Sequence, residues 1–284
     1  MTDVARLLNS RSFVELGARE RARALLDADS MRELLGPFDR LMSPWLPGQG
    51  IVPQADDGVV IAKGTLDGRP LVLAAIEGAF QGGSMGEVGG AKIAGALELA
   101  VEDNRKGIPT AAVLLLETGG VRLQEANLGL AAIAEIQAAI VELRQFQPVV
   151  GLVAGAVGCF GGMSIAAGLC SHLIVTREAR LGLNGPQVIE QEAGIDEYDS
   201  RDRPFIWSLT GGEQRHACAL ADSYIADDVE QLRTALARAL AAGEPALPRS
   251  RRHADFLALL NKLGADCEQL DARRVRAIYQ GELQ

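Results

Sequence analysis

The sequence predicts an α/β fold on three observations. Short runs of Val, Leu and Ala, such as TAAVLLLE and PVVGLVAGAVG, alternate with helical patterns through the middle of the chain. Apolar runs of this length are typical of strands buried on both faces, and alternation with helices favours parallel pairing through crossover connections. A Gly-Gly pair also follows each of three such runs. At 284 residues and 48% hydrophobic content, the chain is long enough to bury a large core.

Residues 1–57 are predicted to form an N-terminal helical extension and a connector. Ser12 and Glu15 match a capping box ahead of a helix that includes Leu16 and Leu25. Pro and Gly then interrupt residues 36–53 too often for a helix or a central strand, which indicates a surface connector. The first residues carry acidic side chains and no continuous apolar segment, so we expect no secretory signal.

The core domain is predicted over residues 58–242. It begins with strands at Val59–Thr65 and Pro70–Ile76, joined by an Asp67-Gly68 hairpin turn. Strand, Gly-Gly pair and helix then repeat, with helices expected over residues 87–103, 125–144 and 163–169.

The remaining elements are shorter. Strands are predicted at His172–Thr176, Ala179–Leu183 and Ser223–Ile225, and helices from Pro186, over Glu213–Leu220 and within DDVEQLRTALARALAA. Residues 243–284 are expected to form C-terminal helices after a break at 243–252.

Composition excludes several classes of function. With 28 basic and 37 acidic side chains the formal net charge is −9, which repels phosphodiester backbones, so we expect no nucleic-acid partner. No run of 18 apolar residues is present, so we expect no membrane span. The four cysteines are 11, 48 and 49 positions apart, matching neither a disulfide framework nor a C-x-x-C zinc site. We therefore expect reduced thiols, no metal and a cytoplasmic location.

The Gly-Gly pairs are candidates for oxyanion holes. A pair between the end of a strand and the start of a helix can present backbone N–H groups where the helix dipole favours negative charge. Tight turns and close helix packing are the alternative explanation. A dinucleotide site is disfavoured because Gly155, Gly158 and Gly161 are spaced G-x-x-G-x-x-G rather than G-x-G-x-x-G. The G-K-S or G-K-T of a P-loop is absent.

The side chains around the glycine pairs leave catalytic and structural interpretations open. A role in proton transfer or nucleophilic attack competes with a purely structural one for His172, His216, Cys159, Glu117 and Glu125. Contact with phosphates competes with simple solvated charge for Lys92, Arg122 and Arg180. Charge alone makes Arg201 and Arg203 candidates for docking an acidic partner.

Four strings, in this order, resemble the carboxyltransferase branch of the crotonase-like superfamily: QGGSMGEVGGAKIAGALELA, ETGGVRLQEA, GCFGGMSIAAG and LNGPQVIEQ. The resemblance covers about residues 59–227. Within that branch, SFVELGARERARALLD, FQGGSMGEVGGAKI and ETGGVRLQEANLGL are most similar to the β subunits of biotin-independent malonate decarboxylases. Residues 1–158 contain no cysteine, whereas the related acetyl-CoA carboxylase β subunits need paired C-x-x-C motifs for a zinc ribbon.

The resemblance implies a crotonase/ClpP-like spiral of β-β-α units with flanking N- and C-terminal helices. The implied reaction converts a malonyl thioester on an acyl-carrier protein to acetyl thioester and CO2, through an enolate held by backbone amides. The catalytic amides would be those of Gly161 and Gly162, and then those of Gly119 and Gly120. The implied substrate-binding residues are Gly82, Gly83, Ser84, Met85, Arg122 and Met163.

The resemblance also implies partners but no tightly bound cofactor. The substrate would be carried on the CoA-like prosthetic arm of the acyl-carrier protein. The implied partners are a homologous crotonase-like γ subunit, the carrier protein and the carrier's transferase subunit. Two alternatives stay open: an acetyl-CoA carboxylase carboxyltransferase β subunit, and a non-catalytic scaffold that completes the partner's site.

Overall fold

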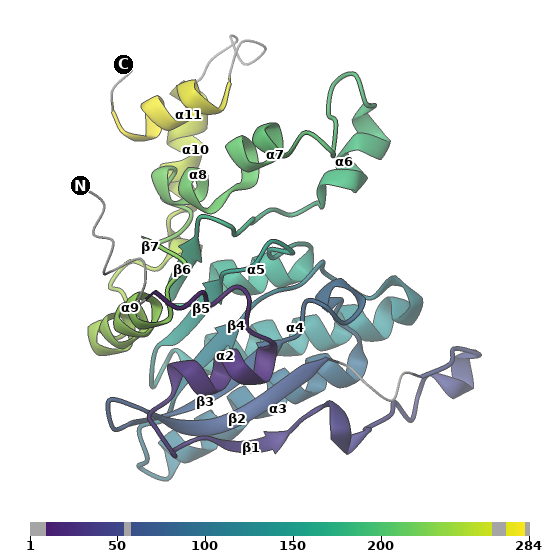
Figure 1. Ribbon diagram of the computed structural model, residues 1–284, viewed down its shortest axis with the longest axis vertical. Helices are drawn as coiled ribbons and strands as arrows, with labels where there is room; N and C mark the ends of the chain where they lie inside the picture. The colour runs from purple at the N-terminus through teal and green to yellow at the C-terminus, as the bar shows by residue number, and fades with distance from the viewer. Residues whose placement is uncertain (1–9, 54–57, 263–270, 282–284) are drawn as a thin grey trace.

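A single seven-stranded sheet organises the chain, as the computed structural model shows for residues 10–53, 58–262 and 271–281 (Figure 1). The strands lie in sequence order, β1 to β7. The first three pair antiparallel and β3 to β7 pair parallel, which confirms the predicted crossover topology. Their bounds are β1 (Arg32–Leu35), β2 (Val59–Leu66), β3 (Arg69–Ile76), β4 (Ala111–Leu115), β5 (Val149–Val153), β6 (His172–Thr176) and β7 (Ser223–Ile225).

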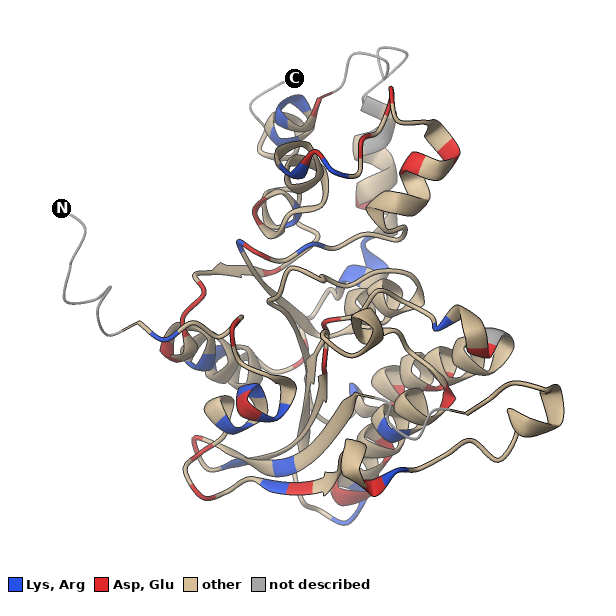
Figure 2. Cartoon of the chain, turned by 45° about the vertical axis from the view of Figure 1, so that its right-hand side comes forward, with Lys and Arg blue, Asp and Glu red and all other residues tan. Residues whose placement is uncertain are grey.

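Helices cover both faces of the sheet. On one face, α3 (Glu87–Arg105), α4 (Ala126–Leu143) and α5 (Gly162–Leu169) pack against strand residues such as Val72 and Leu114. On the other, α2 (Ala18–Leu25) and α9 (Val229–Ala242) pack against the alternate residues, such as Leu73 and Val113. The central strands β4 and β5 are fully buried and uncharged, and charged residues lie mainly on helices and loops (Figure 2). Because β4 and β5 are buried on both faces, their sequences are continuous apolar runs rather than alternating apolar and polar residues.

A group of short helices lies beyond one edge of the sheet, at the top of Figure 1. It contains α6 (Pro186–Ala193), α7 (Arg203–Thr210), α8 (Gly212–Ala217), α10 (His253–Lys262) and α11 (Ala272–Tyr279). Short 3-10 segments are η1 (Pro37–Asp39), η2 (Pro47–Gln49), η3 (Gln81–Gly83), η4 (Leu123–Glu125) and η5 (Arg249–Arg251).

Several predicted elements are confirmed. The hairpin turns at Asp67 and Gly68, both with positive φ (50° and 75°), as a two-residue hairpin of this type requires. The predicted helices correspond to α3, α4, α5, α6, α8 and α9, and the strands to β2 to β7. Asp228 caps α9 by accepting a hydrogen bond from Gln231 N (3.0 Å).

Two local predictions are wrong. Ser12 and Glu15 do not cap the first described helix: Ser12 Oγ accepts from Glu15 N (3.3 Å) and donates to Asp227 Oδ2 (2.5 Å), but α2 begins only at Ala18. Residues 179–183 are not a strand: only isolated bridges form there, between Leu181 and Cys159 and between Arg180 and Gly211.

Two elements were not predicted. The four-residue strand β1 pairs with β2, so part of the expected extension belongs to the same sheet as the core. The helix α7 is capped by Asp202, which accepts from Phe205 N (3.0 Å), and Pro204 lies in its first turn. That Asp-Arg-Pro string was a usable helix-start signal. The domain boundaries after residues 57 and 242 stay predictions, and residues 263–270 of the C-terminal segment lie outside the described residues.

Candidate functional site

The Gly-Gly pairs lie together at one edge of the sheet. Gly82 and Gly83 follow β3, and Gly119 and Gly120 follow β4; Gly161 precedes α5 and Gly162 is its first residue. Because β3, β4 and β5 are parallel neighbours, their carboxyl ends meet at the same edge. The three Gly-Gly loops therefore lie side by side along this edge.

The backbones of the loops approach too closely for side chains. A Cβ added at Gly83 would lie 1.9 Å from the Glu117 carbonyl oxygen. A Cβ at Gly120 would lie 3.3 Å from Gly161 Cα, and both residues have positive φ (106° and 61°). We call the contact between Gly120–Val121 and Gly161–Gly162 the glycine corner. Its formation requires glycine at positions 120 and 161.

Most of the predicted amides are occupied within the protein. Gly119 N donates to Gly82 O (2.8 Å), Gly120 N to Thr118 Oγ1 (3.1 Å) and Gly161 N to Leu183 O (2.7 Å). The expectation that these three amides point outward is therefore wrong.

The amides of Gly162 and Met163 are in a different position. They belong to the first turn of α5, where helical N–H groups have no acceptor within the helix, and no side chain caps this helix among the described residues. Val121 N lies nearby, 3.7 Å from the position of a Cβ on Gly161. Val121 forms a β-bridge with Met85, but the hydrogen bonds of that bridge come from the neighbouring residues: Met85 N donates to Gly120 O, and Arg122 N donates to Met85 O. The N–H of Val121 therefore points away from Met85. Gly162 N and Val121 N are thus the candidate donors at the glycine corner.

A cavity of about 550 Å³ adjoins the corner. Predicted site residues that line it are Gly82, Ser84, Gly119 and Arg122. The side chains of Met85 and Met163 are instead buried in the core, 1% and 0% exposed, so the expectation that they contact substrate holds at most for their backbone atoms.

Arg122 and Glu125 form a buried ion pair in the wall of this cavity. Arg122 Nη1 donates to Glu125 Oε1 (2.9 Å), and its Nε donates to Ser84 Oγ (3.2 Å). Glu125 Oε2 accepts from Glu87 N (2.7 Å) at the start of α3. The charge of Arg122 is therefore balanced inside the protein, and Glu125 acts as a dipole partner for a helix N-terminus.

We expect Glu125→Gln to reduce the free energy of unfolding by about 3 kcal/mol, because it leaves the Arg122 charge buried without a counter-charge. Urea unfolding followed by circular dichroism measures this change. The matched control is Glu142→Gln, whose pair with Arg105 is exposed and whose loss should cost less than about 1 kcal/mol. Equal losses in the two variants would show that the buried pair has no special role.

The other predicted side chains have structural partners. His172 Nε2 lies 2.7 Å from Gly243 O, and His216 Nδ1 lies 3.2 Å from Ala221 O. Glu117 forms a buried ion pair with Arg21, and Lys92 Nζ donates to Gly36 O (3.0 Å). Burial raises the pKa of the Cys159 thiol, which disfavours the thiolate that a nucleophile needs. Arg180 lies in a different cavity, described below.

Sequence reasoning missed Thr118, which joins the loops of the corner. Its hydroxyl oxygen accepts from Gly120 N. Its backbone N–H donates to Gly158 O (2.7 Å), and its backbone carbonyl accepts from Phe160 N (3.0 Å). The short-range signal was available, because a Thr hydroxyl often bonds the backbone two residues on. The bonds to residues 158 and 160 had no local signal.

No group of His, Cys, Asp and Glu side chains among the described residues is arranged to hold a metal ion. In the same part of the chain, no helix is both long enough and apolar enough to cross a membrane. The three described cysteines, Cys159, Cys170 and Cys218, are free thiols, as predicted.

The chain matches a known family and known structures. The carboxyl transferase domain family matches residues 14–238. The malonyl-S-ACP:biotin-protein carboxyltransferase MADC of Malonomonas rubra is 40% identical over 236 residues, which is 80% of this chain and 74% of that protein.

Two solved structures from Pseudomonas are closer in sequence. A chain of a malonate decarboxylase hetero-tetramer, crystallised with malonate, is 74% identical, with 98% of this chain and 100% of that chain covered and a TM-score of 0.91. A chain of the malonate decarboxylase MdcD-MdcE hetero-dimer is 66% identical, with 90% and 98% covered and a TM-score of 0.76.

Proposed function

The chain belongs to the carboxyl transferase domain family, and from this premise we propose that it acts as the β subunit of a malonate decarboxylase. It has the crotonase-like carboxyltransferase fold. The reaction is loss of CO2 from a malonyl thioester carried on an acyl-carrier protein, leaving the acetyl thioester. The named relative MADC also acts on malonyl-S-ACP, which supports a carrier-bound substrate.

The glycine corner is the observation that carries the proposal. When the malonyl carboxylate leaves as CO2, the bond electrons move to the thioester carbonyl and create an enolate oxygen with negative charge. We assign Gly162 N and Val121 N as the donors to that oxygen, which the uncapped first turn of α5 and the close approach of the two loops support. One such donor typically contributes about 2.7–4 kcal/mol to the transition state. The first step therefore needs no charged side chain at the corner.

The residue roles follow from this geometry. Gly162 and Val121 donate to the enolate, Gly120 and Gly161 allow the close backbone approach, and Gly119 supports the loop by bonding Gly82 O. Gly82, Gly83 and Ser84 border the path of the prosthetic arm, and Arg122 orders Ser84. Addition of a proton to the enolate carbon then completes the acetyl thioester.

Partners are part of the proposal. The Pseudomonas relatives are a hetero-tetramer and a hetero-dimer, so we propose a hetero-oligomer here as well. Its further members would be a homologous crotonase-like γ subunit, the acyl-carrier protein and the carrier's transferase subunit. We propose a cytoplasmic complex without a tightly bound cofactor.

Carboxyl transfer to biotin is the second candidate, because MADC passes the carboxyl group of malonyl-S-ACP to a biotin protein. Both reactions break the same carbon–carbon bond and form the same enolate. They differ only in whether CO2 is released or captured. The glycine corner serves either reaction.

One assay separates the candidates. The chain is co-purified with the crotonase-like subunit encoded beside it and incubated with malonyl thioester in the absence of biotin. We expect acetyl thioester and CO2 in a 1:1 ratio. Acetyl thioester that forms only after a biotinylated acceptor is added would favour the transferase. Product formation that stays unchanged in a folded complex when Gly162 loses its N–H group would favour a non-catalytic scaffold that completes the partner's site.

A further inference from the structure

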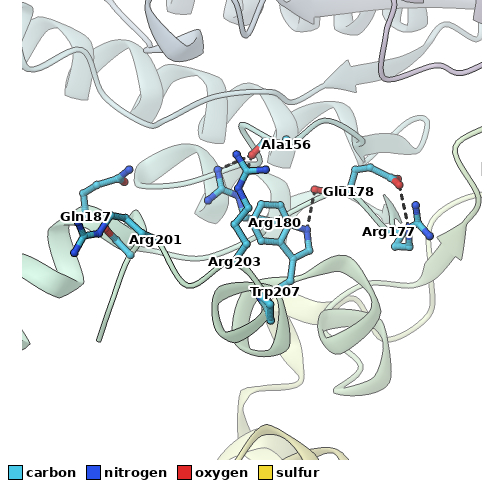
Figure 3. A pocket seen from close by; sticks show the side chains of 10 residues that line it. Ala156, Arg177, Glu178, Arg180, Gln187, Arg201, Arg203 and Trp207 are labelled. Carbon is cyan, nitrogen blue, oxygen red and sulfur yellow. Dashed lines mark hydrogen bonds and ion pairs between the residues drawn. The ribbon is translucent and has the colours of Figure 1, made fainter. Parts of the chain in front are cut away.

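A second cavity, of about 850 Å³, lies beside the loops that follow β5 and β6 (Figure 3). Four arginines line it: Arg177 and Arg180 from the loop after β6, Arg201 from the loop before α7, and Arg203 from the first turn of α7. They are unusual in a chain with a net charge of −9. No residue of the glycine corner lines this cavity.

Arg180 is held rigidly in the wall of the cavity. Its guanidinium lies 4.7 Å from the centre of the Trp207 ring and 5.4 Å from that of Phe160. Its Nε and Nη2 donate to the Ala156 carbonyl (2.9 and 2.5 Å), and Nη2 also lies 3.3 Å from the Val157 carbonyl, so Nη1 is the nitrogen left for a ligand. These contacts fix the group before any ligand arrives, which lowers the entropy cost of binding.

Arg203 places a second positive charge beside the first. Figure 3 shows the two guanidinium groups close together near Ala156. Burial, with a contribution from the charge of Arg203, lowers the pKa of Arg180. Among the described residues, no carboxylate lies within 4.0 Å of either group.

The other two arginines of the cavity each have a carboxylate partner. Arg177 pairs with Glu178 (3.1 Å) and Arg201 with Asp199 (3.3 Å). Glu178 points toward Arg177 and away from the Arg180–Arg203 pair in Figure 3. Two adjacent cations without a counter-charge repel each other, and a bound anion would remove that cost.

We propose that Arg180 and Arg203 bind the phosphate group of a phosphate ester, with its organic part against Trp207. Nη1 of Arg180 and the guanidinium group of Arg203 together offer several hydrogen-bond donors to the acceptor oxygens of a phosphate. A volume of about 850 Å³ also leaves room for more than an inorganic ion. The ester is either a free phosphorylated metabolite or the phosphopantetheine arm of a carrier protein. A free phosphate ester goes beyond the proposed decarboxylation, whereas the carrier arm deepens it and rests on the proposed function.

Binding can be followed with Trp207 as the reporter. The chain has two tryptophans, so Trp45→Phe in the full chain leaves Trp207 as the single source of tryptophan fluorescence. The probes are AMP and 4′-phosphopantetheine, with adenosine and pantetheine as phosphate-free counterparts and inorganic phosphate alone. We expect each phosphate ester that enters the site to bind at least about tenfold more tightly than its phosphate-free counterpart.

Arg203→Gln tests the contact, because this side chain has no bond to the protein among the described residues whose loss would disturb the fold. We expect it to raise the Kd of the bound ester about tenfold or more. The control is Arg238→Gln, an exposed arginine on α9, which should leave the Kd unchanged. Thermal unfolding checks that both variants are folded.

The outcomes are distinct. Tighter binding of 4′-phosphopantetheine identifies the carrier arm as the source, and tighter binding of AMP identifies a free phosphate ester. Equal Kd values for Arg203→Gln and Arg238→Gln would overturn the proposal, as would esters that bind no better than their phosphate-free counterparts. Inorganic phosphate that binds as tightly as either ester would overturn the role of the organic part. A failed decarboxylation assay would leave all of these results intact.

Discussion

Replacing Gly162 by proline is expected to lower the decarboxylation rate by about 10²- to 10³-fold relative to Gly162→Ala. Proline removes the N–H group that we assign to the enolate, whereas alanine keeps it. The position tolerates proline because Gly162 is the first residue of α5, where the ring has the correct φ and no intrahelical hydrogen bond is lost. Gly161, which precedes it, has ψ −147° and lies outside the helical region that proline disfavours in its neighbour.

The alanine variant makes the comparison specific. A Cβ at position 162 would lie 2.9 Å from Ile133 Cγ2, so the Cβ atom that both variants add crowds α4. Any loss of stability that they share cancels in the ratio of their rates. The measurement is kcat for acetyl thioester formation by the assembled complex, with circular dichroism to verify folding. Equal kcat values for the two variants would exclude Gly162 N as a donor.

The sequence predicted those elements that depend on local pattern. Runs such as TAAVLLLE identify buried strands because every residue of β4 is in the core, and Asp228 with the leucines after it specifies α9. The strand β1 was missed because its four residues, RELL, are exposed or half-buried and are defined mainly by pairing with β2. Residues 179–183 have a strand-like composition but no neighbouring strand with which to form a ladder.

At the site, too, the features set by local sequence were predictable and those set by distant contacts were not. Glycines at three strand ends were visible in the sequence, and the parallel sheet brings them together. The direction of each amide was not predictable, because it depends on distant acceptors such as Gly82 O for Gly119 and Leu183 O for Gly161. The Arg180–Arg203 pair likewise joins two loops that are 23 positions apart.

Arg21→Met is expected to reduce the free energy of unfolding by about 3–5 kcal/mol. Arg21, on α2, pairs with Glu117 at the end of β4, and both side chains are 9% exposed. Removing the guanidinium leaves a carboxylate buried without its counter-charge. It also frees the Phe13 and Val14 carbonyls, which accept from Arg21 at 3.1 and 2.6 Å.

The position of Glu117 links this loss to the site. A Cβ at Gly155 would lie 1.7 Å from Glu117 Oε1, and one at Gly78 would lie 2.7 Å from Glu117 Cγ, so this side chain fills the space between the loops after β3 and β5. Its Oε1 also accepts from Val157 N (3.3 Å). Movement of Glu117 would therefore displace the loops that form the glycine corner, and we expect activity to fall together with stability.

Arg19→Met is the matched control, because Arg19 lies on the same helix but pairs with Glu33 where both side chains are about one-third exposed. Its loss should cost less than about 1 kcal/mol in the same urea titration. The double variant Arg21→Met/Glu117→Gln should be less destabilised than the sum of the two single changes, because the buried carboxylate charge is then absent. Two results would contradict this prediction: strictly additive changes in the free energy of unfolding for the double variant, or a decrease for Arg21→Met no larger than that for Arg19→Met. Either would mean that backbone contacts alone hold the loops at the glycine corner.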